Sequence, residues 1–228
     1  MSEQEKGAAC CRPIDHLIEG VRQFKDRFYR QAPELMRTLV DKGQAPAVLL
    51  ISCSDSRVDP TLLSGAGPGE LFVVRNVANL VPPYSVDDSR NSIGAASEYA
   101  VNHLHVDHVV VLGHAHCGGI KAMLEIADGK EPAGEMIGTW VATALDAAKH
   151  YVHEDGSDRA VPVARLKQVP FLVERAAIRE SLKNLATYPW VAKKLAAGTL
   201  KLHGWWFDLD TGDLWATSDE SDVLLPVT

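Results

Sequence analysis

Two cysteines and a histidine follow two strongly apolar segments of the chain, directly where each segment ends. Cys53 comes after the run Ala47-Val-Leu-Leu-Ile-Ser52, and His114-x-x-Cys117 comes after a run from His108 to Leu112. Short runs that are apolar on both faces are typical of buried parallel strands. Because ligand sites lie beyond the carboxyl ends of such strands, the three side chains can meet although they are far apart in the sequence.

Two thiolates and an imidazole are ligands that zinc prefers, and three protein ligands leave the fourth position open, as a catalytic zinc ion requires. The alternative is a buried structural cysteine at Cys53 and an unrelated turn at His114–Cys117. Cys53 alone, or the segment His114–Cys117 alone, favours that alternative, whereas the two together favour a metal site. His116 competes with His114 as the ligand, but it is adjacent to Cys117 and would aim poorly at the same ion. We therefore expect His116 in the loop or beside the site.

A carboxylate and a guanidinium, Asp55 and Arg57, follow Cys53 at short intervals. A carboxylate beside an open metal position can bind the metal and close the site, or accept a proton from bound water. The planar guanidinium of Arg57 can hold the carboxylate away from the metal in a charge-assisted pair. The alternative is an exposed ion pair on a loop, which contributes little energy. Next to a candidate zinc ligand, the spacing favours a functional pair.

The segments that must position these side chains alternate between strand and helix patterns. A third apolar run at Glu70–Arg75 resembles the runs that precede the candidate ligands, and a helical pattern at Ser92–Leu104 follows it. Another helix is expected to begin at Gly118. This alternation predicts an α/β fold with a mostly parallel central β-sheet flanked by helices.

The N-terminal part of the chain differs from this alternation of strands and helices. Apolar residues recur at threes and fours from Pro13 to about Asp41, which predicts a helical arm over residues 13–42, divided into two helices at Pro33. Residues 1–12 are expected to be disordered, and residues 13–228 to form a single domain that includes the arm.

The second half of the chain predicts more helices and a closing hairpin. The helical patterns beyond Gly134 cover about Ile137–Glu154, Val163–Ala186 and Pro189–Ala196. A strand at Leu200–Leu209 then leads through the turn Asp210-Thr-Gly-Asp213 into a C-terminal antiparallel edge strand through Trp215.

Composition argues against several classes of protein. Lys and Arg number 23 against 30 Asp and Glu, a formal net charge of −7, whereas a nucleic-acid surface requires a basic face. No apolar run approaches the roughly 20 residues that span a membrane, and the polar N-terminus has no apolar segment typical of a secretory signal. Four cysteines are too few for a disulfide scaffold in 228 residues. We therefore expect a cytoplasmic protein, and we assign no role to the adjacent Cys10 and Cys11.

The two candidate zinc motifs together resemble the active-site signature of β-carbonic anhydrases. In this chain the motifs are Cys53-Ser-Asp-Ser-Arg57 and His114-x-x-Cys117-Gly-Gly. The resemblance covers roughly residues 30 to 217 and includes the segments Gly69–Asn79, Val81–Tyr84, Gly94–Ala100 and Ser181–Pro189. His116 departs from the small or polar residue expected at its position.

The resemblance implies a role for each matching residue. Zn²⁺ is held by Cys53, His114 and Cys117, with Asp55 and Arg57 as the catalytic pair. A small apolar substrate pocket lies beside the metal, and its positions here are Phe72, Val77 and Gly118. In the plant-like, type I branch of the family, a glutamine and a tyrosine line the cleft from the dimer interface, and Gln44 and Tyr99 match them. The resemblance therefore also implies a homodimer or a dimer-based assembly such as a tetramer.

The reaction implied is that of a lyase, the reversible hydration of CO2 to bicarbonate and a proton. Zinc lowers the pKa of its bound water from about 15.7 toward 7, and zinc hydroxide attacks CO2 held against the apolar wall. Asp55 would accept the hydrogen bond of the hydroxide, and Arg57 would keep Asp55 ionised and oriented. Two other functions stay open. One is hydrolysis of carbon disulfide or carbonyl sulfide on the same fold, which a long apolar access route would favour. The other is a binding module without catalysis, against which the intact Asp55–Arg57 pair argues.

Overall fold

The computed structural model describes residues 13–87, 91–132, 134–148, 150–152, 158–218 and 221–228. The chain divides into two compact units, residues 1–44 and residues 45–228. The disorder expected for residues 1–12, and with it Cys10 and Cys11, lies outside the described residues. Within the described ranges, no helix has both the length and the apolar character needed to cross a membrane.

The described part of the first unit is mainly helical, with its break at the predicted proline. Helix α1 (Pro13–Lys25) continues into a π-helical turn, η2 (Asp26–Gln31), and Pro33 is the first residue of α2 (Pro33–Lys42). Proline fits the first turn of a helix but not its interior, which explains why a new helix begins here. Apolar side chains of the arm stay accessible: Leu17 is 63% and Val21 is 67% exposed. An apolar stripe of this kind requires a surface to cover it.

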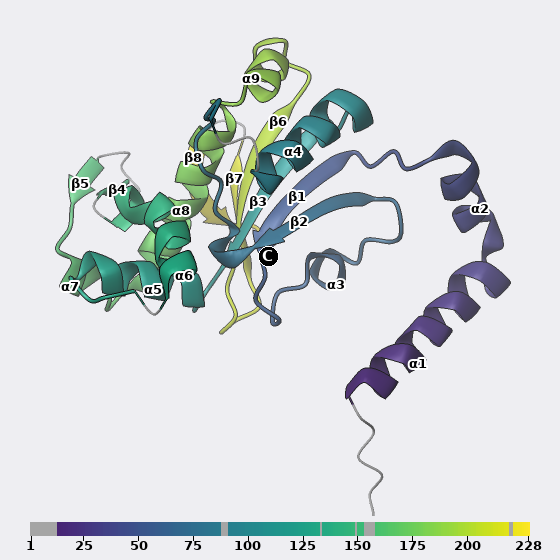
Figure 1. The fold of residues 1–228 in the computed structure, drawn as a ribbon, viewed down its shortest axis with the longest axis horizontal. Helices are drawn as coiled ribbons and strands as arrows, with labels where there is room; N and C mark the ends of the chain where they lie inside the picture. Colours follow the sequence, from purple (N-terminus) through teal and green to yellow (C-terminus); the bar gives the residue numbers. More distant parts are fainter. Residues whose placement is uncertain (1–12, 88–90, 133, 149, 153–157, 219–220) are drawn as a thin grey trace, which may run out of the picture. The chain divides into compact units, whose positions relative to one another are not determined.

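A six-stranded sheet forms the centre of the second unit, in the order β2-β1-β3-β6-β7-β8 (Figure 1). Strands β2, β1, β3 and β6 pair in parallel, and β7 and β8 pair antiparallel. The strand bounds are β1 (Val48–Cys53), β2 (Leu71–Asn76), β3 (His108–His114), β6 (Lys201–Phe207), β7 (Leu214–Ser218) and β8 (Ser221–Pro226). The predicted α/β fold with a mostly parallel sheet is confirmed. Its antiparallel end has two strands where the sequence predicted one.

Helices cover one face of this sheet. Every second side chain of β1 and β3 lies on this face and is fully buried: Leu49, Ile51, Val109 and Val111. They pack in one cluster with residues of α4 (Ser92–Glu98), the π-helical turn η4 (Tyr99–Leu104), α8 (Pro170–Leu185) and α9 (Pro189–Ala196). Runs apolar at every position thus form strands that are buried along their length.

A second buried cluster joins the carboxyl ends of β1 and β3 to the remaining helices. It contains Cys53 and Cys117 together with residues of α8 and of five further elements. These elements are the 3₁₀ turn η3 (Val77–Asn79), α5 (Gly118–Ala127), α6 (Glu135–Val141), the 3₁₀ helix η5 (Ala142–Ala148) and α7 (Val163–Leu166). The candidate ligands therefore lie against the core and not on a free loop.

Two predicted helices are wrong in part. The pattern at Ile137–Glu154 predicted one helix, but η5 ends at Ala148, and β4 (His150–Val152) pairs antiparallel with β5 (Asp158–Ala160). Residues 153 and 154 lie outside the described residues. The pattern at Val163–Ala186 is interrupted between α7 and α8, because Pro170 can begin a helix but cannot stand in its interior.

Candidate metal centre

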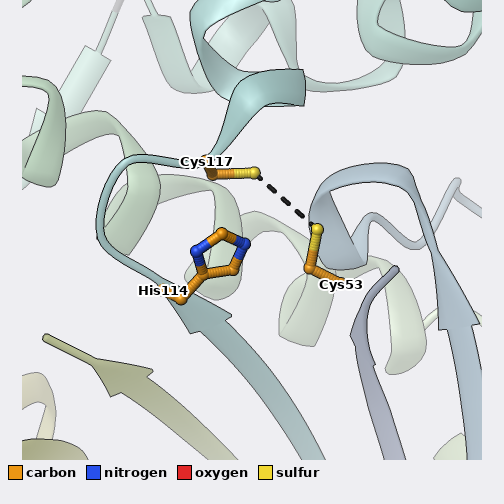
Figure 2. Close-up of side chains that lie close together, drawn as sticks. All are labelled: Cys53, His114 and Cys117. Carbon is orange, nitrogen blue, oxygen red and sulfur yellow. Dashed lines mark hydrogen bonds between the residues drawn. The ribbon is translucent and has the colours of Figure 1, made fainter. Parts of the chain in front are cut away.

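Cys53, His114 and Cys117 come together where β1 and β3 end (Figure 2). Cys53 is the last residue of β1, His114 is the last residue of β3, and Cys117 directly precedes α5. Because β1 and β3 are neighbouring parallel strands, their carboxyl ends lie side by side. The two sulfur atoms and a ring nitrogen all lie within 4.8 Å of one another, and all three residues are buried.

The donor atoms of this cluster fit a zinc ion. The two Sγ atoms are 4.0 Å apart, close to the roughly 3.8 Å expected for two sulfurs about 2.3 Å from a tetrahedral zinc. Nδ1 of His114 donates to the carbonyl oxygen of Ala115 at 2.8 Å, which leaves the lone pair on Nε2. Nε2 is buried and has no hydrogen-bond partner among the described residues. A buried nitrogen of this kind is unfavourable unless a ligand such as a metal occupies it.

The two thiols differ in acidity before any metal binds. The hydrogen bond with Cys117 lowers the pKa of Cys53 well below its usual range, and His114 and the backbone N–H groups of Asp55 and Ala78 act in the same direction. The same hydrogen bond, together with burial, raises the pKa of Cys117. Since the thiolate is the form that binds a metal, Cys53 is prepared for binding, and Cys117 must release its proton.

Asp55 and Arg57 form a two-pronged ion pair beside this cluster. Nε of Arg57 donates to Oδ1 of Asp55 at 2.9 Å, and Nη2 donates to Oδ2 at 2.7 Å. These hydrogen bonds hold the pKa of Asp55 well below its usual range. Oδ2 of Asp55 lies 3.9 Å from Nε2 of His114, so the carboxylate faces the cluster while Arg57 engages both of its oxygens. Nη2 of Arg57 also donates to the carbonyl oxygen of His116 at 3.1 Å, which fixes the guanidinium.

The side chain of His116 is not part of the cluster. It is 53% exposed, and its Nε2 lies 2.7 Å from a carboxylate oxygen of Asp210. The backbone of His116 has φ +59°, an uncommon conformation for a residue other than glycine. The structure thus groups His114, and not His116, with the two cysteines.

Arg75 holds the loop that follows β1, a role that the sequence analysis did not assign. Its guanidinium donates to the carbonyl oxygens of Cys53 at 3.0 Å, Asp55 at 2.8 Å and Val58 at 3.1 Å. It also pairs at 3.0 Å with Asp59, whose side chain caps α3 (Pro60–Ser64). One arginine therefore fixes the backbone on both sides of the Asp55–Arg57 pair. The contacts come from a neighbouring strand, so local spacing gave no signal for them.

The structure places the predicted pocket residues at several points. The rings of Phe72, on β2, and Tyr99, the first residue of η4, lie 5.9 Å apart. Val77 begins the 3₁₀ turn η3 (Val77–Asn79) and is 38% exposed. Gly118 begins α5 and has open space where a Cβ would lie. Gln44 is exposed and belongs to the first unit, whereas the metal cluster belongs to the second.

Glu174 is a buried acid next to Cys117 that the sequence analysis missed. Its two carboxylate oxygens accept one hydrogen bond each, from the backbone N–H of Cys117 and from the indole of Trp206, both at 3.1 Å. The residue is 3% exposed, and burial raises its pKa. Glu174 lies within an ordinary amphipathic helix pattern in α8, which does not distinguish it from other acids. Its carboxylate fixes the backbone from which the Cys117 side chain extends.

We expect Glu174→Gln to lower the free energy of unfolding by about 1–3 kcal/mol. A glutamine has one carbonyl oxygen, so it cannot accept from both donors, and its NH2 group would face one of the two N–H groups. Chemical denaturation measures the change. Glu180→Gln, on the more exposed side of the same helix, is the matched control and should change stability little. Equal effects of the two substitutions would contradict this role of Glu174.

Comparisons with known proteins identify relatives of this chain. A family model described as carbonic anhydrase matches residues 48–214. A carbonic anhydrase from Synechococcus elongatus is 36% identical over 219 residues, which cover 92% of this chain and 77% of the relative. A carbonic anhydrase from Synechocystis sp. is 35% identical over 210 residues, which cover 89% of this chain and 70% of the relative.

Solved structures of β-carbonic anhydrases share the fold. The β-carbonic anhydrase CcaA aligns with a TM-score of 0.78 and 29% identity, over 94% of this chain and 92% of CcaA. One of two tetrameric β-carbonic anhydrases from the ascomycete Sordaria macrospora aligns with a TM-score of 0.69 and 27% identity, over 89% and 95% of the two chains. The family match, the identity to curated relatives and the shared fold show that this chain belongs to the β-carbonic anhydrase family of enzymes.

Proposed function

We propose that this protein catalyses the reversible hydration of CO2 to bicarbonate and a proton, with Zn²⁺ held by Cys53, His114 and Cys117. The observation that carries the proposal is the buried set of donor atoms within 4.8 Å of one another, with a paired carboxylate beside it. When bound, zinc supplies the Lewis acidity that makes a hydroxide nucleophile available near neutral pH. The chain itself must orient that nucleophile and hold CO2.

Asp55 is proposed to orient the nucleophile. The low pKa of Asp55 keeps the carboxylate ionised, so it can only accept a hydrogen bond. When it accepts the O–H of the nucleophile, a lone pair on the oxygen of the nucleophile is left directed toward the CO2 carbon. Arg57 engages both carboxylate oxygens, which restrains Asp55 from becoming a metal ligand itself. The backbone hydrogen bonds from Arg75 keep this loop in place while the reaction proceeds.

The substrate pocket is proposed to lie between η3 and the start of α5. A Cβ placed on Gly119 would lie 2.8 Å from Cγ1 of Val77, so the two segments are in close contact. The side chain of Val77 provides an apolar wall, and Gly118 leaves room for a small molecule. As in the plant-like branch, we propose that Phe72 and Tyr99 extend this wall and that Gln44 of a second copy completes it. An apolar wall suits CO2, which has no hydrogen to donate.

Removal and return of zinc tests the proposed reaction. Stopped-flow measurement of CO2 hydration should show no activity above background in chelator-treated protein. Activity should then rise linearly with added zinc and level off at one equivalent per chain. Protein with a full equivalent of zinc and no CO2 hydration would contradict the proposed function.

We further propose that the protein is a homodimer or an assembly of dimers. The apolar stripe of α1 and α2 is exposed in a single chain, and the Sordaria macrospora relative is described as tetrameric. Light scattering at micromolar concentration should give at least twice the 24.8 kDa mass of one chain. The double variant Leu17→Asp, Val21→Asp should weaken the assembly, whereas Gln23→Asp on the same helix should not. A fully active monomer would contradict this proposal.

We propose that the protein works in the cytoplasm, with small molecules and copies of itself as its partners. Cys53 and Cys117 are free thiols, and unpaired thiols that must bind a metal are maintained in reducing compartments. The net charge of −7 argues against a nucleic-acid partner.

A further inference from the structure

One peptide group joins the Cys117 backbone to the guanidinium of Arg57. The peptide group between His116 and Cys117 donates through its N–H to Oε1 of Glu174 at 3.1 Å. Its carbonyl oxygen accepts from Nη2 of Arg57, also at 3.1 Å. Because a peptide group is planar and its N–H and C=O point in opposite directions, this rigid unit is held from both sides. It therefore connects a candidate metal ligand to the guanidinium that engages Asp55.

The backbone beside this peptide group has a conformation that requires support. His116 has φ +59°, in the left-handed region that residues with a Cβ rarely adopt. Cys117 follows in an extended conformation, with φ −67° and ψ 119°, directly before α5. The loop that contains this bend joins the His114 and Cys117 side chains (Figure 2). The two hydrogen bonds oppose rotation of the peptide group, which would move the Cys117 side chain and the Arg57 contact together.

Trp206, on β6, holds the Glu174 carboxylate in this arrangement. Its indole Nε1 donates to Oε2 of Glu174 at 3.1 Å, so each carboxylate oxygen accepts one hydrogen bond. The Trp206 ring is buried, and the guanidinium carbon of Arg175 lies 4.2 Å from its centre. Its centre also lies 6.3 Å from that of the Trp215 ring, at a steep angle. A ring packed on several sides directs its N–H in one direction, so Trp206 fixes the carboxylate that fixes the peptide group.

The hydrogen bonds form an unbroken series from the core of the protein to the proposed catalytic pair. The series runs through the Trp206 indole, Glu174, the His116–Cys117 peptide group, Arg57 and Asp55. Each donor–acceptor distance in it is between 2.7 and 3.1 Å. Hydrogen bonds in series polarise and strengthen one another, so a change at one end affects the other.

We propose that Trp206 is a positioning residue for the metal centre: through Glu174 and the His116–Cys117 peptide group, it fixes the direction of the Cys117 side chain and the place of Arg57. Outer partners of metal ligands typically change metal affinity or activity by about 10–100-fold. Trp206 is not among the candidate ligands, so it acts through Glu174. The inference rests on the proposed zinc site and on the proposed role of Asp55.

Replacing Trp206 by 3-benzothienylalanine tests the proposal, since this side chain keeps the shape of the ring but has sulfur in place of the N–H. We expect the zinc dissociation constant of the full-length protein, measured by competition with a chelator, to rise about tenfold. At saturating zinc, kcat/KM for CO2 hydration should fall by a similar factor.

The same replacement at Trp215 is the matched control. The Trp215 ring also packs on Arg175, at 4.0 Å, but its buried indole nitrogen has no hydrogen-bond partner among the described residues. The Trp215 variant should stay within twofold of the unmodified protein. Equal changes in the two variants would overturn the proposal, because ring packing and not the Trp206 hydrogen bond would then be responsible.

A double variant tests whether Trp206 acts through Glu174. Glu174→Gln alone should also weaken zinc binding, because one carbonyl oxygen cannot accept from both N–H groups. In that background the Trp206 replacement should change the zinc dissociation constant less than twofold, since members of one network are not additive. A full tenfold change in both backgrounds would overturn the proposal.

A cobalt spectrum reports on the metal ligands independently of catalysis. In the Co²⁺-loaded protein, the sulfur-to-cobalt charge-transfer band should shift in the Trp206 variant and not in the Trp215 variant. An unshifted band together with unchanged zinc affinity in the Trp206 variant would overturn the proposal. If the unmodified protein binds no zinc, the proposed metal centre fails instead, so the two failures are distinguishable.

Discussion

Asp55→Ala is expected to reduce kcat/KM for CO2 hydration by about 10²–10⁴-fold while the protein keeps its zinc. The carboxylate is the acceptor that faces the cluster, with Oδ2 3.9 Å from Nε2 of His114. An alanine removes the acceptor without touching any of the three candidate ligands. The loss should therefore appear in catalysis and not in metal binding. Stopped-flow kinetics and elemental analysis of the same samples measure the two quantities.

The pH dependence of this effect follows from the ion pair. The hydrogen bonds from Arg57 hold the pKa of Asp55 well below its usual range. The carboxylate is therefore already ionised at pH 6 and stays ionised at higher pH. The ratio between the rates of the unmodified protein and Asp55→Ala should therefore stay constant from about pH 6 to 9. A ratio that varies strongly in this interval would show that Asp55 titrates during the reaction, contrary to the proposed role.

Asp210→Ala is the matched control for Asp55→Ala. Asp210 bonds the exposed side chain of His116, so it lies near the same loop but outside the proposed machinery. This control should stay within twofold of the unmodified enzyme. If Asp55→Ala also retained kcat/KM within a few-fold, Asp55 would have no part in the mechanism.

The sequence predicted the metal cluster because the cluster depends on local patterns. Apolar runs mark β1 and β3, each candidate ligand lies at or just beyond a strand end, and neighbouring parallel strands end at the same edge of a sheet. The Asp55–Arg57 pair spans two residues, so its spacing is also visible in the sequence. Where strand ends and short spacings bring side chains together, the sequence alone is sufficient to predict their arrangement.

The supporting residues could not be predicted in this way. Glu174 meets Cys117, and Arg75 meets the loop that follows β1, through contacts that form only after the chain has folded. The hairpin of β4 and β5 was missed because three-residue strands are too short to show a periodicity. The contacts of Glu174 and Arg75 are tertiary, so a local pattern does not contain them.

Loss of zinc is the expected result of Cys53→Ser, His114→Ala and Cys117→Ser, each of which leaves two of the three candidate ligands. Serine is nearly isosteric with cysteine, but its hydroxyl is a far weaker zinc ligand than a thiolate at neutral pH, so the fold should survive while the metal is lost. For His114→Ala, the buried Nε2 that has no partner among the described residues disappears together with the metal. After dialysis against a chelator, elemental analysis should find about one zinc per chain in the unmodified protein and almost none in the three variants.

His116→Ala is the decisive control for this last prediction. Both histidines lie in the segment that ends in Cys117, but the His116 side chain is exposed and bonds Asp210. We therefore expect His116→Ala to keep its zinc. Full zinc content in Cys117→Ser would contradict the assigned ligands, as would loss of zinc in His116→Ala but not in His114→Ala. Loss of zinc in His116→Ala as well as in His114→Ala would instead indicate that the conformation of the loop from His114 to Cys117 contributes to metal binding.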